Sequence, residues 1–118
     1  MELGPSDRAV VLEALVGVCR HRGWELAAAH VRTNRAHAVV SGPATPERML
    51  VDLKAYATRA LRAAGRGRAA HWRRHGSTKY LWTDDEVARA VDYVLNQQGE
   101  LMARWPGPPE APPSEPRP

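Results

Sequence analysis

The sequence has little cysteine and no long apolar run, and each absence excludes a class of protein. Cys19 is the one cysteine in 118 residues, so neither a disulfide within the chain nor a cysteine-based zinc site can form. No run of apolar residues is long enough to span a bilayer, and the first residues, MELGPSDR, lack the pattern of a signal peptide. We therefore expect a cytoplasmic protein with no membrane partner.

Acidic residues are missing between Asp52 and Asp84, although the chain has 13 of them in total and a formal net charge of +4. Basic residues crowd this segment, and binding to a polyanion releases counter-ions from it, so nucleic acid is the leading class of partner. A solvated basic surface without a partner is the alternative. The predicted DNA-binding residues are Lys54, Arg59, Arg62, Arg66, Arg68, Trp72, Arg73, Arg74 and Lys79.

Aromatic residues alternate with these charges near the end of the segment. Trp72, Tyr80 and Trp82 lie among Arg73, Arg74 and Lys79. Such a mixture of stacking surfaces and phosphate-binding charges suits single-stranded nucleic acid, at about 1–3 kcal/mol per stacked base. Packing in the core is the alternative for each aromatic side chain.

The chain is short enough for one domain, which we place at residues 1–104. Residues 105–118, WPGPPEAPPSEPRP, show no apolar periodicity and are rich in proline. Such a composition is typical of an extended, disordered tail.

Helix and strand patterns alternate along the domain. Capping residues and apolar spacing predict helices from Ser6 to Arg22, from Pro46 to about Gly65, and from Asp84 to near Gly99. Residues 24–31, 36–40 and 77–82 read as strands, the first of them diluted by three alanines. This order predicts an α+β domain with helices on one side of a mostly antiparallel sheet.

Two elements carry side chains that could act on a phosphodiester. Arg35 and His37 are two positions apart in a strand, so they share a face with Cα atoms about 6.5–7 Å apart. Tyr93 and Gln97 stack at the rim of the apolar stripe of the third helix. A cation beside a tyrosine nucleophile would allow attack on phosphorus, although packing is the commoner role for such a tyrosine.

Three segments occur in a specific order: NRAHAVV at 34–40, LKAYATRAL at 53–61 and YVLNQ at 93–97. With the Trp-containing basic segment between the last two, this arrangement resembles the single-tyrosine HUH transposases of insertion sequences. The resemblance extends from about Leu12 to Met102 and is greatest to the REP-associated tyrosine transposases.

The resemblance implies a ferredoxin-like fold and a DNA strand-cleaving and strand-joining activity on single-stranded hairpin DNA. Tyr93 would attack the DNA to give a 5′-phosphotyrosine and a free 3′-hydroxyl. The two motif histidine positions and Gln97 would hold Mg²⁺ or Mn²⁺. The family includes dimers that share a site between subunits, so a homodimer is left open.

Two features depart from the family pattern. Arg35 stands at the first motif histidine, and a guanidinium cannot ligate a cation, so His37 and Gln97 remain as neutral ligands. His30 is a conceivable substitute ligand, although a structural role fits a strand histidine better. Residues 1–4 leave little room for the family's first strand, so that strand is truncated, begins upstream or is supplied by a second chain.

The sequence therefore leaves three functions open. The first is a transposase-family enzyme with Tyr93 as the nucleophile. Its catalysis could depend on a metal, use Arg35 in place of the metal, be residual, or be lost. The second is a catalytically impaired or domesticated module that only binds DNA through Arg35 and the basic segment. The third is a protein-interaction domain in which the proline-rich tail is the ligand of a partner.

Overall fold

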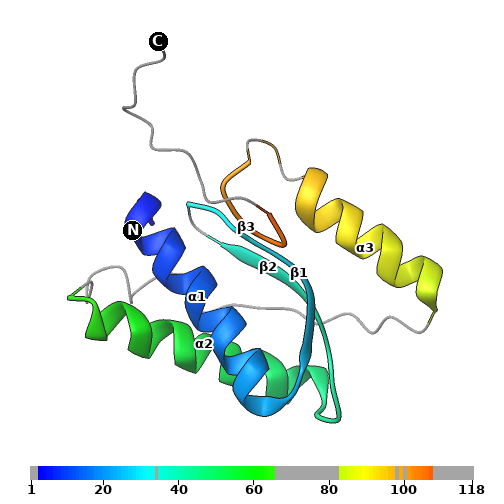
Figure 1. The fold of residues 1–118 in the computed structure, drawn as a ribbon, viewed down its shortest axis with the longest axis horizontal. Coiled ribbons are helices and arrows are strands. Elements are labelled where there is room, and N and C mark those ends of the chain that lie inside the picture. The colour runs from blue at the N-terminus through cyan, green and yellow to red at the C-terminus, as the bar shows by residue number, and fades with distance from the viewer. Residues whose placement is uncertain (1–2, 34, 66–82, 98, 100, 108–118) are drawn as a thin grey trace.

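A computed structural model of the chain describes residues 3–33, 35–65, 83–97, 99 and 101–107. Helices and strands alternate irregularly in this part of the chain (Figure 1). In chain order they are α1 (Pro5–Arg22), β1 (Glu25–Val31), β2 (Ala36–Ser41), α2 (Pro46–Ala63), α3 (Asp84–Asn96) and β3 (Ala103–Trp105). The predicted strand at 77–82 lies outside the described residues.

The helix ends follow from capping residues that the sequence displays. Thr45 and Thr83 each accept a hydrogen bond from the backbone N–H three residues later, which satisfies a donor that the first turn cannot satisfy itself. Gly23 ends α1 with φ of 74°, a left-handed conformation that glycine adopts without strain. The start of α1 differs slightly from the prediction, because Gly4 and not Ser6 is the N-cap.

Among the described residues, three antiparallel strands form a sheet in the order β2-β1-β3. The α+β class with an antiparallel sheet is thereby confirmed, in a form compatible with a ferredoxin-like fold that lacks a strand. Trp105, which we assigned to the tail, instead ends β3, where it pairs with Ala29 and donates its indole N–H to the Leu26 carbonyl oxygen at 3.3 Å. The folded region therefore extends past the predicted boundary at residue 104.

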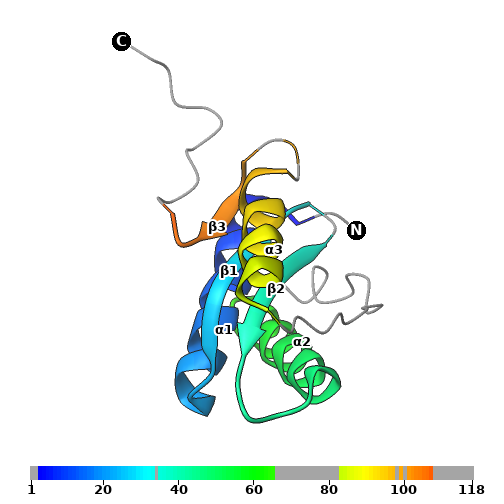
Figure 2. The same cartoon turned by 90° about the vertical axis from the view of Figure 1, so that its right-hand side faces the viewer.

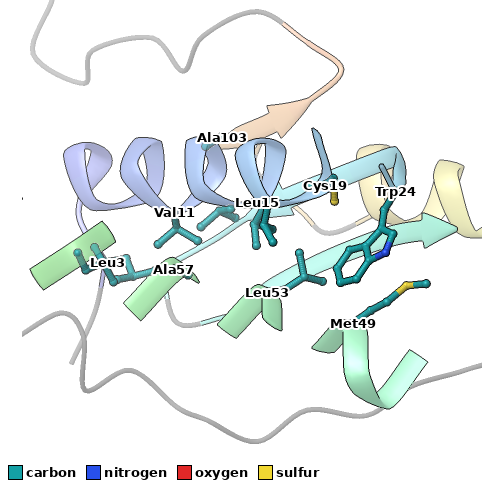
Figure 3. Close-up of a cluster of buried hydrophobic side chains, with 13 residues drawn as sticks. Leu3, Val11, Leu15, Cys19, Trp24, Met49, Leu53, Ala57 and Ala103 are labelled. Atoms are coloured by element: carbon teal, nitrogen blue, oxygen red, sulfur yellow. The ribbon is translucent and has the colours of Figure 1, made fainter. Parts of the chain in front are cut away.

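The main core lies between one face of the sheet and the helices α1 and α2 (Figure 3). Val11 and Leu15 of α1 meet Leu53 and Ala57 of α2 there, and Trp24 closes one end. Amphipathic spacing in both helices explains this layer, because the apolar stripe of each helix removes its surface from water by facing the other helix and the sheet.

The third helix covers the opposite face of the sheet, which corrects the prediction that the helices share one side (Figure 2). Val94 of α3 packs on Ala28 of β1 and Val39 of β2. Neighbouring residues of β1 therefore face different helices, since Ala29 and Val31 belong to the main core. A strand buried on both faces loses the alternation of polar and apolar residues, which is why residues 24–31 gave an ambiguous pattern.

Of the segment before α1, where a first strand was expected, the structure describes Leu3 and Gly4. Leu3 is buried, and its N–H donates to the carbonyl oxygen of Thr33 at 2.6 Å before the chain enters α1. Among the described residues no strand precedes α1, and β2 forms an edge of the sheet. None of the helices described here is both long and apolar enough to cross a bilayer.

Replacing Gly42 with alanine should destabilise the fold. A Cβ atom at this position would lie 2.5 Å from Cδ1 of Trp24 and 3.2 Å from Cε of Met49, so the end of the core would have to shift. Overpacking of this kind costs about 1–3 kcal/mol, measurable by urea unfolding. The control is Gly17→Ala in α1, where nothing lies within 4 Å of the new Cβ and a gain of about 0.5–1 kcal/mol is expected.

Candidate active site

The strand motif lies at the tip of the β1–β2 hairpin. The turn is closed by a hydrogen bond from the Arg32 N–H to the Arg35 carbonyl oxygen at 2.8 Å, and His37 pairs with His30 across the two strands. Val39 contacts α3, so strand alternation puts His37 and Arg35 on this same face of the sheet. Arg35 is exposed and His37 is half-buried.

Tyr93 meets this motif from α3. The helix packs through Val94, and the residue before it projects toward β2, where the Tyr93 ring lies edge-on to the ring of His37. The two ring centroids are 6.4 Å apart and the ring planes meet at 89°. Tyr93 is 52% exposed, so its ring contacts the motif while much of the side chain faces solvent. The structure thus brings together the predicted nucleophile and the predicted strand motif.

The surroundings of His37 disfavour protonation of its ring. Burial, followed by the charges of Arg35 and Arg32, lowers the pKa of His37 below its ordinary value. Its Nε2 atom is buried, and among the described residues it has no hydrogen-bond partner. A buried polar nitrogen without a partner is costly, so Nε2 is an atom that a ligand could satisfy.

His30 has a structural role, because both of its ring nitrogens are used within the fold. Nδ1 lies 3.1 Å from the Val94 carbonyl oxygen, and Nε2 accepts the Met102 N–H at 3.0 Å. This pattern fixes the tautomer with the proton on Nδ1. His30 is fully buried, and burial is the main cause that lowers its pKa. It joins the end of α3 and the start of β3 to the sheet and offers no lone pair to a metal.

Gln97, the other predicted ligand, is exposed at the C-terminal end of α3 and turns back to its own helix. Its amide nitrogen donates to the carboxylate of Asp92, as does that of Asn96 at 2.9 Å. These two hydrogen bonds, that of Asn96 first, lower the pKa of Asp92. The side chain of Gln97 is thereby committed to Asp92 in this structure.

The residues present do not suit the divalent cation that the family resemblance implies. Arg35 has no lone pair, and His37 and Gln97 are neutral, whereas Mg²⁺ and Mn²⁺ prefer several oxygen ligands with negative charge. Within the described ranges, no group of three or more His, Cys, Asp or Glu residues is placed to hold a metal ion. The charge around His37 is therefore positive, whereas a site for Mg²⁺ or Mn²⁺ would need negatively charged ligands.

The predicted DNA-binding residues fall into two groups. Lys54, Arg59 and Arg62 lie on α2, with Arg62 exposed and the Arg59 guanidinium 4.6 Å from the centre of the Tyr56 ring. Since α2 and α3 cover opposite faces of the sheet (Figures 1 and 2), DNA that contacts both helices must pass around an edge of the sheet. Arg66, Arg68, Trp72, Arg73, Arg74 and Lys79 lie outside the described residues.

Arg32 belongs to this site although the sequence analysis did not select it. Its charge acts on both His37 and His30, and its guanidinium lies beside Gly99, just beyond α3. The signal was present, because Arg32 is two positions after His30 and continues the same face of β1. Because Arg32 lies next to a predicted turn, it was not assigned to the face of the strand.

Stability should fall as the pH drops below about 6.5, the ordinary histidine pKa. Both His30 and His37 have lowered pKa values when folded, so near this pH the unfolded chain takes up protons that the folded chain does not. Their contribution is fully present above the unfolded pKa and is lost progressively toward the lower folded pKa. Urea midpoints at about pH 7.5 and about pH 5.5 test this, and equal midpoints would contradict it.

Comparisons with protein-family models, with curated proteins and with solved structures gave no match to this chain.

Proposed function

We propose that this chain binds single-stranded hairpin DNA at the tip of the β1–β2 hairpin and cleaves it through Tyr93, as a transposase-family enzyme. The observation that carries the proposal is the contact between the His37 and Tyr93 rings, 6.4 Å apart between centroids. Two segments far apart in sequence, each resembling a catalytic motif of the same family, meet at one surface.

The reaction is a transesterification. The phenol oxygen of Tyr93 loses its proton and forms a bond to phosphorus, the bond from phosphorus to the 3′-oxygen breaks, and that oxygen takes up a proton to leave as a 3′-hydroxyl. The 5′-phosphotyrosine that results retains the energy of the ester, so the reverse attack by a 3′-hydroxyl joins strands. Half-exposure of Tyr93 is compatible with access by a DNA strand.

A module that only binds DNA is the second candidate, and two observations favour it. Arg35 replaces a motif histidine, and Gln97 is bonded to Asp92. Such a domesticated relative would keep the phosphate-binding charges on α2 and the hairpin without forming a covalent intermediate. A protein-interaction domain, the third candidate, would need neither the phosphate-binding charges nor a covalent intermediate.

One experiment separates the three. The full chain is incubated in Mn²⁺ with a fluorescent DNA hairpin that carries randomised single-stranded flanks, and then analysed on a denaturing gel and by binding at several salt concentrations. The proposal predicts a covalent adduct that survives denaturation. Salt-dependent retention without an adduct would identify the binding module, with a slope of about −0.7 per phosphate contacted on a single strand. Absence of both would leave the protein-interaction domain.

A further inference from the structure

The candidate active site has a concentration of positive charge that a metal-dependent site would not need. Arg32 and Arg35, here called the arginine pair, stand on either side of the hairpin turn, joined through the backbone at 2.8 Å. Strand alternation directs both toward the face that α3 covers, the face of His37. After burial, the charges of Arg35 and Arg32 lower the pKa of His37.

The surroundings of the arginine pair point to an anion as the ligand of this surface. Nε2 of His37 is buried without a partner among the described residues. A guanidinium presents several N–H donors in one plane, which match the oxygens of a phosphate in pairs. Tyr93 borders the same surface through its contact with His37.

We infer that the arginine pair binds the scissile phosphate and supplies the positive charge that a divalent cation supplies in related enzymes. Cleavage by Tyr93 then requires no divalent metal. This inference rests on the proposed function. The bonds made and broken are those of the transesterification above, with no net oxidation or reduction, and the guanidinium groups stabilise the charge that grows on the phosphate oxygens in the transition state.

The test compares adduct formation in Mn²⁺ and in EDTA, with the fluorescent hairpin as the probe. Wild type should form the adduct in EDTA to within about twofold of its yield in Mn²⁺. Arg32→Gln and Arg35→Gln should each lower the yield by about a hundredfold, the effect of removing one donor to a transition-state oxyanion. Arg48→Gln is the control: it removes the same charge from an exposed arginine of α2, paired with Asp52 at 3.5 Å, and should change nothing.

Arg35→His adds a direct check, because it restores the family's histidine pair. Its adduct should require Mn²⁺ and disappear in EDTA. Far-UV circular dichroism of each variant shows whether it is folded, and Arg35 is exposed enough for substitution to leave the fold intact.

A wild-type adduct that forms in Mn²⁺ but not in EDTA would overturn this inference and leave the proposed function standing. Equal adduct yields from Arg32→Gln, Arg35→Gln and wild type would overturn it as well. Absence of an adduct in both buffers would overturn the proposed cleavage itself.

Discussion

Tyr93→Phe should abolish the covalent adduct with hairpin DNA, lowering its yield more than a thousandfold, because phenylalanine has no oxygen to attack phosphorus. Loss of a nucleophile typically costs several orders of magnitude in rate. The phenylalanine ring can still meet the His37 ring edge-on, so the free energy of unfolding should change by no more than about 1 kcal/mol. A denaturing gel measures the adduct, and a urea titration measures stability.

Tyr56→Phe is the matched control for this prediction. Tyr56 is half-buried on α2, on the opposite face of the sheet, and its ring contacts the guanidinium of Arg59. Its adduct yield should equal that of wild type. An adduct that persists in Tyr93→Phe would exclude Tyr93 as the nucleophile. Hairpin DNA should bind Tyr93→Phe to within about twofold of wild type, since most of the affinity comes from phosphate contacts.

Local signals predicted the helices well but not where all of them pack. Thr45, Thr83 and Gly23 fix helix ends through hydrogen bonds and backbone conformations within a few residues, so these ends follow from the sequence. The apolar stripe of α3 predicted a buried face but did not say which side of the sheet would bury it. That choice depends on Ala28 and Val39, whose burial against Val94 cannot be seen from the helix sequence.

The strand β3 was not predicted from the sequence at all. Its three residues carry no strand pattern of their own, and the prolines that follow Trp105 gave the segment the composition of a tail. The segment forms a strand because β1 has an edge with which it can pair. Ala103 pairs with Val31 and Trp105 pairs with Ala29. Strand propensity reports on the fit to a neighbouring strand as much as on the segment itself, so such a short strand escapes prediction.

The candidate site was predictable to the extent that it depends on strand and helix periodicity. Alternation placed Arg35 and His37 on one face, and helical spacing placed Tyr93 at a rim. The hydrogen bonds of Gln97 to Asp92 and of His30 to Val94 were not predictable, because several partners lay equally within reach of each side chain. These bonds decide which residues remain available for a ligand. They disfavour a metal site and are one reason for proposing the arginine pair as the phosphate-binding group.

His30→Leu should destabilise the fold by roughly 2–5 kcal/mol, because one buried and one partly buried backbone group lose the side-chain partner that His30 provides. Leucine has a similar volume but cannot donate to the Val94 carbonyl oxygen or accept the Met102 N–H, and each unsatisfied group costs about 1–3 kcal/mol. The Val94 carbonyl belongs to the last turn of α3, and carbonyl groups of a last turn generally lack an N–H partner within the helix. Urea unfolding measures the loss.

His21→Leu provides the comparison, since His21 is exposed in the last turn of α1 and its replacement should stay within about 0.5 kcal/mol. Equal stabilities of the two variants would show that the hydrogen bonds of His30 do not hold α3 in place. If the prediction holds, the effect should reach the candidate active site. His30 anchors the turn of α3 that follows Tyr93, so loosening that turn should also lower the adduct yield of the folded fraction of His30→Leu, although His30 itself is fully buried.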